Sequence, residues 1–238
     1  MIFEGAISVK AILENKKRNI NCLYVVEKKN DRNTRYILSL ADKRNIPVKT
    51  ISKEEIDSLA VGHTHGGLLI DADNRKYESI KGILDKENFV CIIDGIEDPF
   101  NIGYAMRSLY AYGATAIIIN NHSLSNMESQ ILKSSAGSYE HLKVVNSKNL
   151  VADIKYLKSK KLTIYALNRS DISCSLENVK LEDNLAFIIG GEKRGISKLI
   201  RAEIDQEVYL EYDNEFRNAL NASSALSIFA FYRHLKNK

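Results

Sequence analysis

The sequence lacks the segments that mark membrane and secreted proteins. No stretch reaches the roughly 18 consecutive apolar residues that a membrane-spanning helix needs. The N-terminus has no basic stretch followed by an apolar one, so we expect no signal peptide. The three cysteines, Cys22, Cys91 and Cys174, are too widely spaced for a metal or redox motif. We therefore expect a cytoplasmic protein with no membrane partner and no metal.

Two common nucleotide-binding motifs are also missing. The G-x-G-x-x-G fingerprint of a dinucleotide site does not occur. Gly190 and Gly195 have the spacing of a P-loop, but Ile196-Ser197 follows where that loop requires Lys-Ser or Lys-Thr. The sequence therefore argues against a nucleoside triphosphatase and against a Rossmann dinucleotide site.

The composition is typical of a globular protein. Hydrophobic residues make up 45% and charged residues 27%, and the formal net charge is +4. This mild positive charge permits an anionic partner without requiring one. A length of 238 residues suits one large domain or two small ones. Because residues 71–86 lack a clear core pattern, we place a domain boundary near residue 80, which gives domains 1–80 and 81–238.

The first domain alternates predicted helices and strands. We expect helices at residues 3–13, 32–44 and 53–59, and strands at 21–26, 48–51 and 68–71. His63 and His65 lie in a glycine-rich turn before the last of these strands. We interpret them as turn residues, because no third metal ligand is near them in the sequence.

Residues 89–120 organise the second domain. The unbroken apolar runs 89–93 and 116–119 are typical of parallel strands that are buried on both faces. Between them a helix is indicated, which Asn101 could cap and which Gly113 could end. Its apolar face would consist of Ile102, Ala105, Met106 and Leu109. This strand–helix–strand unit predicts an α/β fold with a parallel sheet.

Polar residues follow the first of these strands. Asp94, Glu97, Asp98 and Asn101 would lie at the carboxyl edge of the sheet, where open α/β sheets bind ligands. The remaining elements are predicted as strands at 142–145, 162–167, 185–189 and 208–210, helices at 127–135, 150–160 and 218–235, and a small-residue turn at 135–138.

Three motifs carry the chemistry of the second domain. They are Asp98-Pro99-x-Asn101-x-Gly103-x3-Arg107, Gly190-Gly191-Glu192-x2-Gly195-Ile196-Ser197, and Leu220-Asn221-Ala222-Ser223. In this order they resemble the three motifs of the SpoU branch of the SPOUT superfamily, which are S-adenosylmethionine-dependent RNA 2′-O-ribose methyltransferases. The resemblance covers most of residues 89–238. Residues 1–80 resemble the ribosomal-protein-like RNA-binding domain of the family, with His65-Gly66-Gly67 where the family usually has His-Gln-Gly.

The resemblance implies a fold, a cofactor and partners. The C-terminal half would form a deep trefoil knot that holds S-adenosylmethionine, and the enzyme would be a homodimer. The substrate would be the ribose 2′-hydroxyl of a structured RNA, with ribosomal RNA preferred over transfer RNA because enzymes with this domain order often act there.

Carried over by position, the resemblance also implies the site residues. The cofactor would contact backbone around Gly190, Gly191, Leu210 and Leu220, and the catalytic residues would be Asn101, Arg107, Glu192 and Asn221. Arg107 is often proposed as the base in this family. Its forked guanidinium suits a phosphate clamp better, because a pKa above about 12 makes deprotonation costly.

Structural roles remain open for the same residues. Asn101 could be only a helix cap, Arg107 a solvated surface residue, and Glu192 a partner for backbone amides in a turn. The Lys-Arg clusters at 16–18, 158–161 and 193–194 are either solvated faces or RNA contacts.

The third motif departs from the family pattern. The family usually has Ser-Leu-Asn where this chain has Ala219-Leu220-Asn221, and the missing hydroxyl is implicated in positioning the reactive groups. Ser223 and Ser224 follow, but helical spacing directs them elsewhere. This departure supports a second hypothesis, a noncatalytic RNA-binding protein that keeps the knotted fold; the intact catalytic set opposes it.

The last predicted helix is apolar on two sides. Ala222, Leu226 and Phe229 form one stripe, and Ile228, Phe231 and Leu235 form another. One stripe can pack on the sheet of its own domain. We expect the other to bind the same region of a sister subunit.

Overall fold

The structure, a computed structural model, describes residues 1–62, 64–120, 124–191, 194–215 and 220–236. The predicted roles of His63, Glu192 and Ala219 therefore lie outside the described residues. The chain divides into two units, which we call unit 1 (Met1–Lys76 and Ser125–His141) and unit 2 (Tyr77–Leu124 and Leu142–Lys238). Within the part of the chain that is described, no helix combines the length and the apolar character that crossing a bilayer requires.

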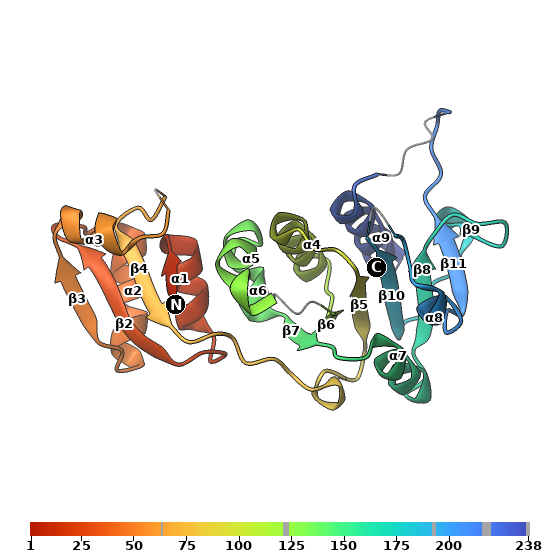
Figure 1. Cartoon of the computed structure of the whole chain (residues 1–238), viewed down its shortest axis with the longest axis horizontal. Helices are drawn as coiled ribbons and strands as arrows, with labels where there is room; N and C mark the ends of the chain where they lie inside the picture. Colours follow the sequence, from red (N-terminus) through yellow and green to blue (C-terminus); the bar gives the residue numbers. More distant parts are fainter. Residues whose placement is uncertain (63, 121–123, 192–193, 216–219, 237–238) are drawn as a thin grey trace. The chain divides into compact units, whose positions relative to one another are not determined.

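Unit 1 is built on a mixed four-stranded sheet with the order β1-β4-β2-β3. Figure 1 shows β2 between β3 and β4. The strand β4 pairs antiparallel with both β1 and β2, and β2 pairs parallel with β3. The elements of the N-terminal part are β1 (Ile2–Glu4), α1 (Ala6–Glu14), β2 (Ile20–Val26), α2 (Arg32–Lys43), β3 (Val48–Ile51), α3 (Lys53–Leu59) and β4 (Leu68–Ala72).

The first predicted helix, at residues 3–13, is wrong at its start. Ile2–Glu4 form β1, which pairs with β4 and buries Phe3 completely. Gly5 has φ of 85°, a conformation that few other residues adopt, and the helix begins after it. Phe3, which we had assigned to the helix, therefore belongs to an edge strand of the sheet.

Two helices that come later in the sequence complete unit 1. They are α5 (Glu128–Ser134) and α6 (Ser138–His141), where α6 was not predicted. Gly137, between them, has φ of 87°, and a Cβ at this position would lie 2.8 Å from the Cβ of Ala11. The glycine lets this segment pack closely on α1.

Unit 2 contains a seven-stranded parallel sheet with the order β7-β6-β5-β10-β8-β11-β9. This confirms the predicted α/β class. Its elements are the single-turn helix Ile80–Gly82, β5 (Phe89–Asp94), α4 (Pro99–Ala111), β6 (Ala116–Ile119), β7 (Lys143–Asn146), α7 (Leu150–Ser159), β8 (Thr163–Leu167), β9 (Cys174–Ser175), the single turn Leu176–Asn178, β10 (Leu185–Gly190), α8 (Lys198–Arg201), β11 (Gln206–Tyr209) and α9 (Ala222–Lys236). Another single turn, Leu124–Asn126, begins in unit 2 and ends in unit 1.

Both faces of this sheet are covered. Figure 1 shows α4 and α9 on one side and α7 and α8 on the other. Phe229 of α9 stacks on Phe187 of β10 with ring centroids 3.8 Å apart, whereas Ile188, the next residue, packs in the cluster with Ile154 of α7 and Ile200 of α8. Successive side chains of a strand point to opposite faces of the sheet. Because both faces are buried, the side chains on both are apolar, which explains the unbroken apolar runs in the sequence.

Two helix starts differ from the predictions. Asp98, not Asn101, caps α4, because the Asp98 carboxylate accepts a hydrogen bond from the backbone amide of Asn101 at 2.7 Å. The cap role proposed for Asn101 is therefore wrong, and its side chain is available for other contacts. The last helix was predicted from residue 218, but α9 begins at Ala222, and Asn221 precedes it. The short elements β9 and α8 were not predicted.

Candidate active site

Two loops meet at the carboxyl edge of the unit 2 sheet. The strands β5 and β10 are neighbours, and Asp94 lies opposite Gly190 where both strands end. The Asp94 carbonyl accepts a hydrogen bond from the Gly191 amide at 2.8 Å. Its carboxylate accepts another from the Ser197 amide at 3.0 Å. Asp94, four residues before the first predicted motif, thus joins the loop that leads to this motif to the second motif.

Glycine is required in the second motif because backbones approach closely there. A Cβ at Gly190 would lie 2.3 Å from the carbonyl carbon of Gly195, and a Cβ at Gly191 would lie 2.3 Å from the carbonyl oxygen of Gly95. A side chain at Gly190 would displace the Gly195 backbone within the second motif, and one at Gly191 would force the two loops apart. These glycines therefore shape the edge of the sheet whether or not a ligand is bound.

A cavity of about 710 Å³ opens beside these glycines. Its lining includes all four residues that were predicted to bind the cofactor: Gly190, Gly191, Leu210 and Leu220. The size suits a small organic ligand. Its other walls are Leu167, Asn168, Arg169, Ile189, Gly195, Ile196, Tyr209, Tyr212, Asn221, Ala222 and Ala225. Apolar side chains, backbone edges and a few polar groups make a lining that fits S-adenosylmethionine, which has both an aromatic base and charged groups.

A second cavity, of about 550 Å³, adjoins the first. The two share Gly191, Gly195 and Ala222, and the second is also lined by Asn101 and Arg194. Three carboxylates lie in its wall, those of Asp94, Glu97 and Asp98. Within the described residues, no group of three or more His, Cys, Asp or Glu side chains is arranged to hold a metal ion.

Two predicted catalytic residues meet at these cavities. The Asn221 side-chain amide donates a hydrogen bond to the Asn101 side-chain oxygen at 3.3 Å. Asn221 in turn is held by Ser223, whose hydroxyl and amide donate to its side-chain oxygen at 2.6 and 2.9 Å. The expectation that helical spacing directs Ser223 elsewhere is therefore wrong, because Asn221 lies just before the helix and folds back over its first turn.

Arg107 is placed differently from the other predicted catalytic residues. It is exposed on α4 and lines neither cavity. An ideal helix turns about 600° over the six residues from Asn101 to Arg107, so the two side chains leave the helix in different directions. The structure therefore brings together Asn101 and Asn221 but leaves Arg107 outside the cavities.

The sequence analysis missed the residues that support the cavity from the strand side. Glu207 of β11 is buried, and its carboxylate accepts hydrogen bonds from Asn168 at 2.8 Å and from Ser170 at 2.5 Å. Burial raises the pKa of Glu207, but these hydrogen bonds and the charge of Arg201 outweigh it and hold the pKa below its usual value. Glu207 thus fixes the segment after β8. No motif signals this role, since it depends on strand order.

Tyr212 was missed as well. Its hydroxyl accepts a hydrogen bond from the Leu220 amide at 3.1 Å, and both residues line the larger cavity. The contact joins the two ends of the connection that precedes α9. An isolated tyrosine in a polar connection carries no sequence signal for this contact.

Comparison with known proteins places this geometry in a family. The model of the SpoU rRNA methylase family matches residues 88–231, and the model described as RNA 2′-O ribose methyltransferase substrate binding matches residues 2–78. Among curated relatives, the 23S rRNA (guanosine-2′-O-)-methyltransferase RlmB of Xanthomonas axonopodis is 28% identical over 235 residues, which cover 95% of this chain and 93% of the relative. RlmB of Xylella fastidiosa is 26% identical with the same coverage of both chains.

Solved structures share the fold over the whole chain. The SpoU methyltransferase AviRb from Streptomyces viridochromogenes, in complex with the cofactor AdoMet, has a TM-score of 0.83 at 17% identity and covers all of this chain and 90% of its own. An AdoMet-bound rRNA methyltransferase from Sinorhizobium meliloti has a TM-score of 0.81 at 17% identity, covering 98% and 87%. Because the family model spans residues 88–231, well over half of the sequence, the chain belongs to the SpoU rRNA methylase family.

Proposed function

We propose that this protein transfers the methyl group of S-adenosylmethionine to a ribose 2′-hydroxyl of ribosomal RNA. It is an RNA 2′-O-methyltransferase that uses this cofactor, with residues 1–80 contacting the RNA and residues 81–238 performing the transfer. The observation that carries the proposal is the meeting of the first and third motifs, through Asn101 and Asn221, beside a cavity lined by all four predicted cofactor residues.

The larger cavity would hold the cofactor. S-adenosylmethionine supplies a methyl group that is already activated by its sulfonium sulfur. The chain contributes the walls of the site: Gly190 and Gly191 bring backbone to the cavity, and Leu210 and Leu220 also line it. We also propose that the backbone around this cavity, in the C-terminal half of the chain, forms the trefoil knot that the family resemblance implies.

The smaller cavity would hold the ribose. Asn101 and Asn221 are already hydrogen-bonded to each other, so their amide groups are oriented before the RNA binds. Such groups can donate to the ribose oxygens and hold the 2′-hydroxyl against the cofactor cavity. Holding two reactants in place can supply about 7–11 kcal/mol of a reaction barrier. Positioning is therefore the main contribution that we assign to these residues.

Arg107 and Glu192 complete the proposed catalytic set. Arg107 is exposed, and its guanidinium can hold an RNA phosphate in a two-pronged contact. We assign it this role, because it lies outside both cavities and a proton acceptor would have to reach into one of them. Glu192 stays in the set on the strength of its motif alone.

Ribosomal RNA is the substrate that the comparisons favour. Relatives that match nearly the full chain are named 23S rRNA methyltransferases. In contrast, a tRNA-modifying enzyme from A. aeolicus covers 64% of this chain. A ribosomal substrate would also place the enzyme in the cytoplasm.

We further propose that the enzyme is a homodimer. On α9, Ala222, Leu226 and Phe229 are buried in unit 2, as predicted for the first stripe. Ile228, Phe231 and Leu235 are 44%, 44% and 53% exposed. Tyr104 and Tyr110 of the neighbouring helix α4 are exposed as well. A second copy would cover this surface.

The test combines binding and transfer. Calorimetry should show that the purified protein binds S-adenosylmethionine, and labelled methyl should appear on unmodified 23S ribosomal RNA transcripts as a 2′-O-methyl nucleotide. If the protein binds both RNA and cofactor but transfers no methyl, the noncatalytic alternative holds. If methyl is transferred to transfer RNA transcripts only, the ribosomal assignment is wrong.

A further inference from the structure

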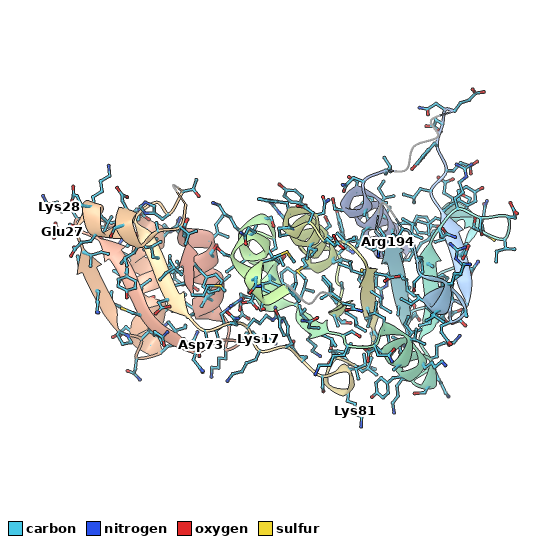
Figure 2. The ribbon with its side chains drawn as sticks, viewed as in Figure 1. Lys17, Glu27, Lys28, Asp73, Lys81 and Arg194 are labelled. Atoms are coloured by element: carbon cyan, nitrogen blue, oxygen red, sulfur yellow. The ribbon has the colours of Figure 1, made fainter. Side chains whose placement is uncertain are left out.

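A hollow in unit 1 has no part in the motifs for methyl transfer. It measures about 780 Å³ and lies between the end of β2, the start of α3 and the turn before β4. Its walls are Val26, Glu27, Lys28, Lys29, Lys53, Ile56, Asp57, Gly62, His65, Gly66 and Gly67. Figure 2 shows Glu27 and Lys28 together at one end of unit 1, with Lys17 and Asp73 at the other.

Glycine shapes this hollow. Gly67 has φ of +77°, and a Cβ there would lie 2.5 Å from a methyl carbon of Val26. The Val26 amide donates a hydrogen bond to the Gly67 carbonyl at 3.0 Å, so the turn lies directly against the strand end. Gly66, with φ of +55°, has no atom within 4 Å of the Cβ it would carry. The wall at Gly66 is therefore bare backbone that is open to a ligand.

His65 is fixed by both of its ring nitrogens. The Gly67 amide donates to Nδ1 at 3.1 Å, and Nε2 lies 3.0 Å from a carboxylate oxygen of Asp57. Because Nδ1 accepts a hydrogen bond, the ring proton is on Nε2 and is donated to Asp57. Both ring nitrogens are thus engaged, and the side chain, 14% exposed, forms part of the wall of the hollow.

The hollow is lined by charges of both signs, three lysines (Lys28, Lys29 and Lys53) and the carboxylates of Glu27 and Asp57. Lys29 is paired with Asp31 at 2.7 Å. Lys28 and Lys53 form no ion pair with any residue that the structure describes, and Lys28 extends from a left-handed backbone position, with φ of 61°. Two lysines without an ion pair among the described residues therefore flank a recess whose wall includes His65 and bare backbone. Glu27, also in the wall, can accept hydrogen bonds from an exocyclic amine.

This combination fits an unstacked nucleotide. Proteins read single-stranded RNA by splaying out a base, stacking it on a ring and hydrogen-bonding its edge. Lysines bind the flanking phosphates. We propose that the hollow holds one nucleotide from a loop or bulge of the RNA substrate, with its base against His65 and Gly66 and its phosphates on Lys28 and Lys53. This inference rests on the proposed function and adds a second RNA contact, remote in sequence from the methyl-transfer motifs.

The test is a double variant, Lys28→Ala with Lys53→Ala, and the probe is an unmodified 23S ribosomal RNA transcript. Its affinity is measured by filter binding over a range of salt concentrations. We expect a loss of at least tenfold. We also expect the slope of log affinity against log salt to fall by about 1.4, since each contact to a single-stranded phosphate contributes about 0.7. The KM for RNA should rise, whereas kcat and the affinity for S-adenosylmethionine should stay unchanged.

A matched control removes the same charge elsewhere in unit 1. Lys10 and Lys43 are exposed and line no part of the hollow. The variant Lys10→Ala with Lys43→Ala should bind RNA within about twofold of the wild type, because neither lysine lines the hollow and Lys10 is already paired with Glu14. Circular dichroism should be native for both variants, since all four lysines lie at the surface or rim.

The outcomes separate this inference from the proposed function. If the wild type methylates the transcript and the hollow variant binds it equally well, the hollow is not an RNA site and the function stands. If both double variants lose affinity alike, the lysines act through general charge and the inference is wrong. If the wild type neither binds nor methylates the transcript, the proposed ribosomal substrate fails, and the inference fails with it.

Discussion

At the scale of single residues, Ser223 is the position that bears most directly on Asn221. It donates two hydrogen bonds to the Asn221 side-chain oxygen, and this leaves the amide nitrogen directed at Asn101. The family usually places a hydroxyl two residues before the asparagine, where this chain has Ala219. Ser223, two residues after it, supplies a hydroxyl from the other side.

The variant Ser223→Ala should therefore slow methyl transfer. Losing one neutral hydrogen bond of about 0.5–1.5 kcal/mol corresponds to roughly a threefold to tenfold fall in kcat. The affinity for S-adenosylmethionine should change little. Single-turnover kinetics on the RNA substrate give the measurement. Ser224→Ala is the control, because Ser224 is the exposed neighbour and should leave the rate unchanged.

Arg107 can be tested independently of the cavities. We expect Arg107→Ala to reduce kcat/KM at least about a hundredfold, on the order of 3 kcal/mol of transition-state stabilisation. Cofactor affinity should not move, since Arg107 lines neither cavity. Arg107→Lys should recover little, because an ammonium cannot reproduce a two-pronged phosphate contact. Near-normal activity in the alanine variant would show that Arg107 is only a solvated side chain.

Glu207 should make stability depend on pH. Its folded pKa is lowered, so the ionised carboxylate stabilises the fold above the unfolded pKa of about 4.3, and this contribution disappears as the pH falls through the lower folded value. At pH 7, Glu207→Gln should lower the free energy of unfolding by roughly 1.5–3 kcal/mol, the usual range for hydrogen bonds to a charged group.

The difference in the free energy of unfolding between the wild type and Glu207→Gln should become smaller as the pH falls towards 3. Urea unfolding followed by circular dichroism at several pH values measures it. Glu211→Gln, at an exposed position just after β11, is the matched control and should behave as the wild type throughout. A difference for Glu207→Gln that stays constant with pH would show that packing, not charge, is responsible.

At the scale of elements, a buried charge cluster attaches α5 and α6 to the rest of unit 1. The Arg18 side chain is 1% exposed, and those of Glu128 and Glu140 are fully buried. Arg18 contacts Glu140 at 2.7 Å and also pairs with Glu128. Burial lowers the pKa of Arg18, but the two carboxylates raise it by more, so the charge is retained. The cluster joins residues that are more than 100 positions apart in the sequence.

Arg18→Ala should destabilise unit 1 strongly. Removing one partner leaves two carboxylates buried without their cation, and such changes cost about 3–5 kcal/mol. The control is Arg35→Ala, at an exposed arginine of α2, which should change stability by no more than about 0.5 kcal/mol. Urea unfolding compares the two variants. Equal urea midpoints for the two variants would mean that the charge cluster contributes no stability beyond that of the apolar contacts around it.

The elements show which features the sequence could predict. The strands at 48–51 and 116–119 and the helix at 53–59 match the structure, because their apolar periodicity and, for the helix, the Ser52–Glu55 capping box are local signals. The charge cluster could not be predicted, since Arg18, Glu128 and Glu140 give no sign of burial in their own segments. Nor could the role of Glu207, because the order of strands β8, β11 and β9 decides what it contacts.

The same distinction applies to the site. The four cofactor residues, which the family resemblance implied, all line one cavity because each lies at or near the end of a strand or the start of α9. The close approach of Gly190 to Gly195 could not be foreseen, since it depends on the path of the chain after β10. The sequence allowed Asn101 to be either a helix cap or a catalytic residue. The structure excludes the first role, because Asp98 caps the helix.

At the scale of the whole molecule, we expect the exposed stripe of α9 to form the interface of the proposed dimer. Ile228, Phe231 and Leu235 are each roughly half exposed, and the Phe231 ring lies 5.3 Å from that of Tyr112. Burying a large apolar side chain contributes about 1.5–3 kcal/mol. In a twofold-symmetric dimer the stripe of one subunit would pack against the same stripe of the other, which is the commonest way in which two identical subunits associate.

Phe231→Glu should split the proposed dimer and abolish methyl transfer, because a carboxylate in its interface would be buried without a partner. The monomer should remain folded, since Phe231 is 44% exposed within its own chain. Sedimentation equilibrium at micromolar concentration, with circular dichroism in parallel, measures both effects. Leu199→Glu is the control, because Leu199 is 76% exposed on α8, the helix on the other face of the sheet, and its substitution should leave the dimer intact. A wild type that sediments at 26.9 kDa and still methylates RNA would show that one subunit suffices for catalysis.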